Sequence, residues 1–250
     1  MRSAKKTPRA RLDQAGEREF LRDYEPSDFP RPSVTVDLAV FSVLDAELRI
    51  LLVKRGAHPF KGSYALPGGF VRVGDGHHDQ GEDLDAAAAR ELAEETALST
   101  ADVYLEQLGS FGKAGRDPRM RVITVAYYAL VRPDLAPLVR AGGDASHAEW
   151  IPVASLRARD LAFDHFDIIA AARARIAKEL EATSILAHLV PSTFTIPELR
   201  NVHEIVSGEA QDPGNFRRRF LRRLEDGVIA RAPGKRITVS KPAAVYRFAR

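Results

Sequence analysis

The order of apolar and polar positions predicts a sheet in the front part of the chain. Residues 34–44 and 48–53 are rich in β-branched side chains that partly alternate with polar ones, and the short polar segment between them predicts a β-hairpin. Residues 103–111 and 120–131 show the same strand pattern. We expect residues 149–152 to complete the sheet.

Two segments instead have the helical period. These are residues 83–96 and about 164–182, the second with Ile168, Ile169, Ala172 and Ile176 on its inner face. This order of strands and helices predicts an α/β fold, an α/β/α sandwich on a mixed sheet. Residues 1–32 mix charges with proline without a sustained period, which indicates a mostly flexible N-terminal arm.

The first predicted helix carries three carboxylates on one side. Because each helical residue advances by 100°, Glu91, Glu94 and Glu95 fall within an arc of about 100°. Carboxylates so close repel one another unless a cation lies between them, and hard oxygen ligands suit Mg²⁺ or Mn²⁺. The alternative is a solvated acidic face with an Arg90–Glu94 pair. The side that packs on the sheet is predicted to contain Ala86, Ala89, Leu92 and Ala93.

The residues around this helix resemble the Nudix box. Glu82 is followed, after seven residues, by Arg90-Glu91-Leu92-Ala93-Glu94-Glu95, and Pro67-Gly68-Gly69 precedes them. The resemblance implies a Nudix fold and a divalent metal held by Gly69, Glu91, Glu94 and Glu95. It also implies a catalytic set made of Glu82, Arg90, Glu91, Glu94 and Glu95.

Two positions depart from that box. Twelve residues separate Gly69 from Glu82, where the box has five, and Ala97 replaces a glycine that ends the helix. A helix commonly ends in the left-handed conformation that glycine adopts most easily. The longer loop is expected to loosen the metal geometry, so we predict metal binding with slow turnover.

Basic residues near this motif are candidates for binding a diphosphate. The loop of residues 113–121 contains Arg116 and Arg119, and arginine can hold phosphate oxygens in a bidentate manner. Arg55, in an earlier loop, and His165 are further candidate ligand contacts. The alternatives are an ordinary solvated loop and a structural histidine.

Composition narrows the class of protein. A chain of 250 residues, 45% hydrophobic, is long for one small domain, which favours two domains. The absence of cysteine excludes disulfides, thiolate metal sites and a cysteine nucleophile. We expect a cytoplasmic protein with no membrane partner, because there is neither a spanning apolar run nor a signal peptide. Residues 191–250 carry a net charge of +6 and residues 1–190 a net charge of −3. The basic part is therefore expected to face a polyanion.

The basic part has the pattern of a winged helix-turn-helix. Thr195 and Glu198 form a capping-box motif, and a first helix is predicted to end near Gly208. A second helix opens at residues 212–215, and residues 228–248 are typical of a β-ribbon.

The second of these helices is rich in arginine. Its wheel places Phe216 and Phe220 on one side and centres Arg218, Arg219 and Arg222 on the other. A solvated face or an acidic protein partner is the alternative to nucleic acid. Double-stranded DNA is favoured because a helix fits the major groove of B-form DNA. The predicted DNA contacts are Asn215, Arg217, Arg218, Arg219, Arg222, Lys235 and Arg236.

Together these motifs resemble one family, the Nudix-related transcriptional regulators of NAD metabolism (NrtR). The resemblance covers residues 34–248, with its more specific motifs at residues 161–165 (LAFDH), 194–204 (FTIPELRNVHE) and 215–219 (NFRRR). It implies a homodimeric repressor of NAD biosynthesis or salvage genes, released from its operator when ADP-ribose binds the Nudix domain. Hydrolysis stays open because the box glutamates are retained, and a Mg²⁺-dependent ADP-ribose pyrophosphatase with an accessory basic domain is the alternative.

The predicted domains are an N-terminal arm (1–32), a Nudix domain (33–160), linking helices (161–190) and a winged helix-turn-helix domain (191–250). Residues 163–189 are predicted to carry the effect of the ligand to the DNA-binding domain.

Overall fold

The computed structural model describes residues 14–25, 28–74, 80–139, 148–180, 184–237 and 242–249. Met1–Pro32 and Ser33–Arg250 form two compact units. In the first unit, α1 spans Gln14–Asp23, a helix that the sequence analysis did not predict. Its Gln, Ala, Glu and Arg residues have high helix propensity, which needs no apolar period. No helix of the described ranges is long and apolar enough to cross a membrane.

The second unit contains the predicted mixed sheet. Within the described residues the strand order is β3-β2-β1-β6-β5, with β4 beside β1 and β7 beside β2. β1 runs parallel to β6, and the other pairs are antiparallel. The strands are β1 (Ser33–Leu44), β2 (Glu47–Lys54), β3 (Tyr64–Ala65), β4 (Gly68–Phe70), β5 (Val103–Phe111), β6 (Val122–Val131) and β7 (Ala148–Pro152).

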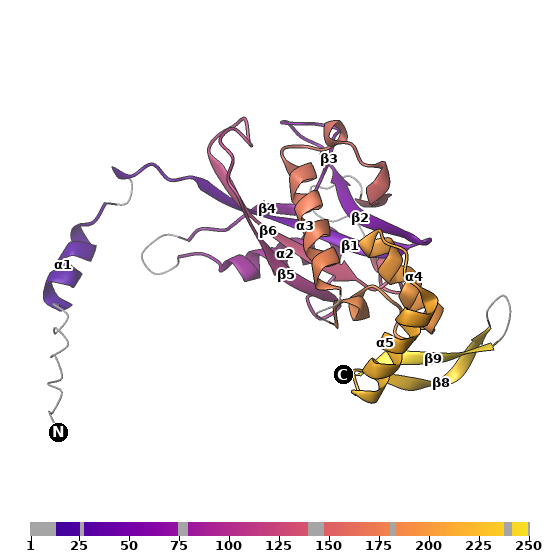
Figure 1. Cartoon of the computed structure of the whole chain (residues 1–250). Coiled ribbons are helices and arrows are strands. Elements are labelled where there is room, and N and C mark those ends of the chain that lie inside the picture. The colour runs from indigo at the N-terminus through magenta and orange to yellow at the C-terminus, as the bar shows by residue number, and fades with distance from the viewer. Residues whose placement is uncertain are drawn as a thin grey trace, which may run out of the picture. The chain divides into compact units, whose positions relative to one another are not determined.

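Alternation along β1 accounts for helices on both faces of the sheet. Val36, Leu38 and Val40 are buried in one cluster with α2 (Leu84–Thr96). Ala39, Phe41 and Val43 alternate with them, point to the other face and lie in one cluster with α3 (His165–Glu179). Figure 1 shows the two helices with the sheet strands. The α/β/α sandwich and the predicted inner face of α3 are confirmed, since Ile168, Ile169, Ala172 and Ile176 are buried.

Short 3-10 turns connect these elements. They are η2 (Ala136–Leu138), η3 (Val153–Ser155), η4 (Ala158–Asp160) and η5 (Ser184–His188). The last of these follows α3 and leads into the C-terminal part of the chain.

The C-terminal elements form the predicted winged helix. They are α4 (Ile196–Ser207), α5 (Pro213–Glu225) and the antiparallel ribbon of β8 (Ile229–Ile237) and β9 (Pro242–Phe248), which lies next to α5 in Figure 1. The capping box at Thr195 and Glu198 is present. Gly208 ends α4 with φ 76°, a conformation that favours glycine.

One buried core joins the sheet to the winged helix. It continues from Ile176 of α3 through Leu186 of η5 to Leu199 of α4 and Phe216 of α5. A displacement of α3 therefore has a packed path to the helices of the C-terminal part.

Candidate functional site: an acidic helix, a cleft and an arginine-rich helix

α2 packs on the sheet by a face that matches the predicted one only in part, since Leu92 is buried as predicted. Ala87 and Ala88 are buried, whereas Ala86 and Ala93 are exposed. The packing face is rotated toward the carboxylates, so Glu91 lies at its edge and is only 7% exposed. The helical wheel of α2 gives only the angles between its side chains. Packing on the sheet decides which side of the helix is buried.

The helix ends where the sequence predicted. Ala97 adopts the left-handed conformation, with φ 60° and ψ 13°, and its N–H donates to the carbonyl of Ala93 at 3.1 Å. A residue with a side chain costs roughly 1–2 kcal/mol in this conformation. Ala97 stands where the Nudix box has glycine, so the backbone is locally strained at this end of α2.

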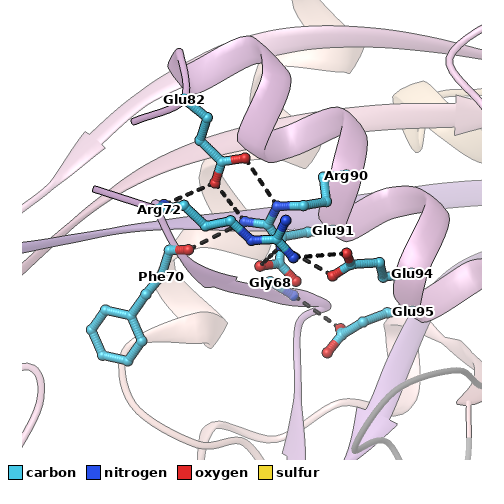
Figure 2. Close-up of polar contacts among 8 residues, drawn as sticks. All are labelled: Gly68, Phe70, Arg72, Glu82, Arg90, Glu91, Glu94 and Glu95. Carbon is cyan, nitrogen blue, oxygen red and sulfur yellow. Dashed lines mark hydrogen bonds and ion pairs between the residues drawn. The ribbon is translucent and has the colours of Figure 1, made fainter. Parts of the chain in front are cut away.

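Arg90 is the centre of an ion-pair network on α2 (Figure 2). Its Nη2 donates to Glu82 Oε1 at 2.6 Å, and its Nη1 donates to Glu91 at 2.7 Å and to Glu94 at 3.0 Å. The hydrogen bond from Arg90 lowers the pKa of Glu82 to about 2, and Glu82 in turn raises the pKa of Arg90. This arginine therefore keeps Glu82 ionised and holds all three carboxylates in place.

The long loop between Gly69 and Glu82 is closed at its base. The backbone N–H of Arg72 donates to Glu82 Oε1 at 2.9 Å, and the N–H of Glu82 donates to the Arg72 carbonyl at 3.1 Å. Arg72 also pairs with Glu94 at 3.1 Å. Part of the insertion, residues 75–79, lies outside the described residues. The structure therefore does not support the expectation that the insertion loosens the metal geometry. The inserted residues lie between Arg72 and Glu82, and these two residues are hydrogen-bonded to each other.

The glycine pair brings the backbone against the carboxylates. A Cβ at Gly69 would lie 2.3 Å from Glu91 Oε1, so a larger residue there would displace the Glu91 carboxylate. The N–H of Gly68 donates to Glu95 Oε2 at 3.0 Å. Burial, together with the negative charges of Glu91, Asp37 and Glu94, raises the pKa of Glu95 to about 7.

The chemistry of these donors fits a divalent cation, although they are not gathered into a finished site. Hard carboxylate and carbonyl oxygens suit Mg²⁺ or Mn²⁺, and the surplus negative charge around Glu95 is what a cation would relieve. In the described part of the chain, no three acidic or imidazole side chains are close enough together to hold a metal ion. Arg90 lies between Glu91 and Glu94 instead.

A cleft of about 610 Å³, open to solvent, lies beside the glycine pair. All four predicted ligand residues line it, although they come from separate parts of the chain. They are Arg55, Arg116, Arg119 and His165.

Two of the four residues are buried and bound to structural partners. The Arg116 side chain is 4% exposed, and it donates to Asp164 at 2.7 Å and to Asp37 at 3.2 Å. His165 is buried and accepts a hydrogen bond from the N–H of Leu66 at Nδ1, and burial lowers its pKa. Their side chains are therefore fixed in the cleft wall, and the prediction that both are available to grip a ligand is not supported.

Arg55 has no carboxylate partner among the residues that the structure describes. Its Nε donates to the carbonyl of Pro59 at 2.8 Å, and its guanidinium lies 4.9 Å from the centroid of the Phe163 ring. In the described residues its terminal nitrogens have no hydrogen bond or ion pair. Burial and the charge of Arg119 lower its pKa, as expected for a cation that an anion would stabilise.

Arg119 lies on the Phe70 side of the cleft. It pairs with Asp117 at 2.7 Å, and its guanidinium lies 5.7 Å from the centroid of the Phe70 ring. Its side chain is 42% exposed, so Arg119 can still reach a ligand.

Among the residues that line the cleft, sequence reasoning did not name Asp37 or Phe70, whereas it did place Phe163 at the edge of the pocket. Asp37 had a signal, because a carboxylate within an apolar strand needs a partner. Phe163 has the left-handed φ of 53°, which is unusual for an aromatic residue. Such conformations cluster at functional sites. No local pattern marks such a conformation.

α5 presents only some of its arginines to solvent. Arg217, Arg218 and Arg222 are exposed, and Arg218 also contacts Asn215. Arg219 is half-buried, pairs with Gln211 at 2.5 Å and lies over the Phe216 ring. Its predicted place at the centre of the exposed face is therefore wrong, because it folds back over the apolar side of α5.

The predicted wing residues differ in the same way. Lys235 is exposed, whereas Arg236 is half-buried and pairs with Glu198 at 2.6 Å. The expectation that Arg236 contacts phosphate is not supported, because its guanidinium already has a carboxylate partner. The unpredicted Arg231 and Arg247 are exposed on the same ribbon.

These elements define a class of protein, a Nudix domain followed by a DNA-binding winged helix. Residues 34–172 match the NUDIX domain family, and residues 186–248 match the NrtR DNA-binding winged helix domain. The chain belongs to the NrtR family. It is 38% identical over 239 residues to an ADPR responsive transcriptional repressor NtrR of Acinetobacter baylyi, which covers 96% of this chain and 91% of that protein.

Solved structures agree with this assignment. Shewanella oneidensis NrtR complexed with a 27mer DNA is similar with a TM-score of 0.72 and 34% identity, over 86% of this chain and 93% of that one. The NUDIX domain of the same protein complexed with ADP ribose has a TM-score of 0.52 and 35% identity, over 64% of this chain and 98% of that domain.

Proposed function

We propose that this protein is a transcriptional repressor that binds operator DNA through its winged helix and is released by ADP-ribose bound in the Nudix cleft. The observation that carries the proposal is Arg55 in that cleft, which has no carboxylate partner among the described residues. One continuous core joins the cleft to a helix with exposed arginines. The family resemblance supports NAD biosynthesis or salvage genes as the regulated genes.

The cleft has the chemistry that ADP-ribose requires. A diphosphate takes charge-assisted hydrogen bonds from guanidinium groups, which Arg55 and Arg119 can donate. The rings of Phe70 and Phe163, each beside one of these arginines, provide apolar faces for an adenine or a ribose. Arg116 and His165 shape the wall behind the ligand.

α3 connects this cleft to the DNA-binding part. It begins with His165 in the cleft wall, and the core at its other end continues into η5 and α4. ADP-ribose must bind the DNA-incompatible arrangement more tightly, and DNA must then weaken ADP-ribose binding by the same factor. A typical coupling free energy is about 1–3 kcal/mol.

Two copies are proposed to act together on DNA. One small winged helix makes too few contacts to select a site in a genome, so a homodimer on a pseudo-palindromic operator is expected. Light scattering of the free protein and of the DNA complex tests this, and a monomer in both states would contradict it.

The experiment that tests the proposed function is a measurement of DNA affinity at fixed salt across a titration with ADP-ribose. Promoter DNA of NAD biosynthesis or salvage genes is the probe, and NAD and AMP are the control ligands. Affinity should fall with ADP-ribose and not with the controls. Unchanged affinity at saturating ADP-ribose would remove the sensing role.

Hydrolysis of ADP-ribose is the second candidate function, supported by the retained carboxylates. Gly69, Glu91, Glu94 and Glu95 would hold Mg²⁺ or Mn²⁺, which polarises the diphosphate and its attacking water when bound. Arg90 orients Glu91 and Glu94 through its ion pairs. AMP release from ADP-ribose should be slow and abolished by EDTA and by Glu95→Gln. Turnover indifferent to both would exclude this role for the acidic residues.

A further inference from the structure

The side chain of Arg236 points to the start of α4 and is only partly exposed. Its Nη1 lies 2.6 Å from Glu198 Oε2, and its Nη2 donates to the carbonyl of Thr193 at 3.0 Å and to its hydroxyl at 3.2 Å. Arg236 thus contacts a side chain 38 residues away in the sequence. Three contacts to two residues fix the plane of the guanidinium.

Its partner Glu198 already has a second contact. The same Oε2 accepts a hydrogen bond from the N–H of Thr195 at 2.8 Å, which is half of the capping box. Although burial opposes ionisation, the hydrogen bond from Arg236 lowers the pKa of Glu198. One carboxylate oxygen therefore joins the first turn of α4 to the wing.

The backbone continues the same connection. Phe194 and Tyr246 exchange two hydrogen bonds of 2.8 Å each, so the segment before α4 pairs with β9. The rings of Phe194 and Phe248 lie 5.1 Å apart. This backbone pairing fixes the C-terminal half of β9, whereas Arg236 lies toward the wing tip, where it pairs with Ala243.

Lys235 and Arg236 face opposite sides of the ribbon. Successive side chains of a strand alternate in direction, and Lys235 is exposed whereas Arg236 is half-buried. The residue that turns inward is thus the one with a carboxylate partner, and its neighbour remains available to an anion.

We propose that Arg236 is a positioning residue for DNA binding, which fixes the wing against α4 through Glu198 while Lys235 contacts the DNA backbone. This inference rests on the proposed DNA-binding function. Without the ion pair, the outer part of the ribbon loses this contact with α4, so Lys235 would no longer be held in one place.

The test compares three variants on a duplex selected by the wild-type protein from a random-sequence pool. Glu198→Gln retains the acceptor that the capping box needs and removes only the charge, and Arg236→Ala removes the other partner. Each should weaken binding about two- to fivefold, as expected for one partly exposed ion pair. The double variant should weaken binding no further. Neither single change should alter the salt dependence, whereas Lys235→Ala should flatten its logarithmic slope by about 1.

The sign of the Glu198→Gln effect decides between the two roles. If Arg236 contacted phosphate directly, removing the carboxylate would free a cation, so Glu198→Gln would tighten binding and Arg236→Ala would flatten the salt slope. Either result overturns the proposal.

Hydrogen exchange of the free protein tests the same proposal without DNA. Amides of β8 and β9 near the wing tip should exchange faster in Glu198→Gln and Arg236→Ala than in the wild type, and unchanged exchange overturns it. If the wild type selects no duplex, the proposed function fails, and the exchange measurement still tests the contact between wing and helix.

Discussion

The backbone N–H of Leu66 donates a hydrogen bond of 2.9 Å to Nδ1 of His165. This bond joins the residue before Pro67 and the glycine pair to the first residue of α3, although 99 positions separate them. Nδ1 is an acceptor only in a neutral imidazole protonated at Nε2, and burial favours that form by lowering the pKa of His165. The cleft wall and the helix that leads to the DNA-binding part are thus fixed to each other.

His165→Ala should reduce the effect of ADP-ribose on DNA affinity. It removes the acceptor for Leu66 and leaves a buried N–H unpaired, at a cost of about 1–3 kcal/mol, so α3 no longer follows the cleft wall. His165→Asn is the matched control, because its amide oxygen can take the place of Nδ1. DNA affinity with and without saturating ADP-ribose measures the coupling, and equal coupling in all three proteins would exclude this route.

Arg55→Ala should weaken ADP-ribose binding by about 1.5–3 kcal/mol, the usual worth of hydrogen bonds to a charged group. Its thermal stability should hardly change, because Arg55 has no carboxylate partner among the described residues. Calorimetric titration measures the affinity for ADP-ribose, and thermal unfolding measures the stability. A lower melting temperature with unchanged affinity would assign Arg55 a structural role.

Arg116→Ala should behave in the opposite way. It leaves the carboxylates of Asp37 and Asp164 without their cation in a mostly buried site, which typically costs about 3–5 kcal/mol of stability. Denaturant unfolding measures this loss. A stable Arg116→Ala protein with weaker ligand binding would show that Arg116 grips the ligand after all.

Replacing Arg218 and Arg222 together with alanine should weaken DNA binding and flatten its logarithmic salt slope by up to about 2. Both side chains are exposed on α5. Arg219→Ala is the matched change on the same helix and should leave the salt slope as it is, because Arg219 contacts Gln211 and Phe216. Normal binding by the double variant would show that another surface contacts DNA.

Glu95 should make the stability of the protein fall as the pH rises. Its pKa is raised from 4.5 to about 7, so the folded state binds more protons than the unfolded state between these values. The stability is therefore fully present below pH 4.5 and is lost as the pH rises through 7. Glu95→Gln should be more stable than the wild type at pH 8, by at most about 3 kcal/mol, and similar at pH 4.5.

Mg²⁺ supplies the control for this pH effect. It should raise the melting temperature of the wild type at pH 8 more than that of Glu95→Gln, since a bound cation favours the ionised carboxylate. Thermal unfolding at both pH values, with Mg²⁺ or EDTA, measures the effect. An equal pH dependence in wild type and variant would refute the assignment.

Ala97→Gly should stabilise the protein by about 0.5–1 kcal/mol. Glycine removes the strain of the left-handed conformation at φ 60°, and the greater freedom of the unfolded chain offsets part of the gain. Ala93→Gly is the control within the same helix, where glycine should cost about 0.5–1 kcal/mol. Denaturant unfolding of both variants checks the sign, and a destabilising Ala97→Gly would contradict this account.

The sequence by itself determined the features that depend on local spacing. The capping box at Thr195 and Glu198, the left-handed end of α2 at Ala97 and the inner face of α3 are each set by residues within a few positions of one another. The period of the strands and helices likewise determined the α/β/α sandwich and the winged helix, since burial of an apolar face requires a partner layer.

Only the tertiary structure decided which cations are available to a ligand. The sequence gives no reason to distinguish Arg55 from Arg116, or Lys235 from Arg236. In the structure, Arg116 and Arg236 are the members of these pairs that have carboxylate partners. Those partners are Asp37, Asp164 and Glu198, which lie 79, 48 and 38 positions from the arginines that they bind. Charge pairing depends on distance in space, and a local pattern contains no information about carboxylates so far along the chain.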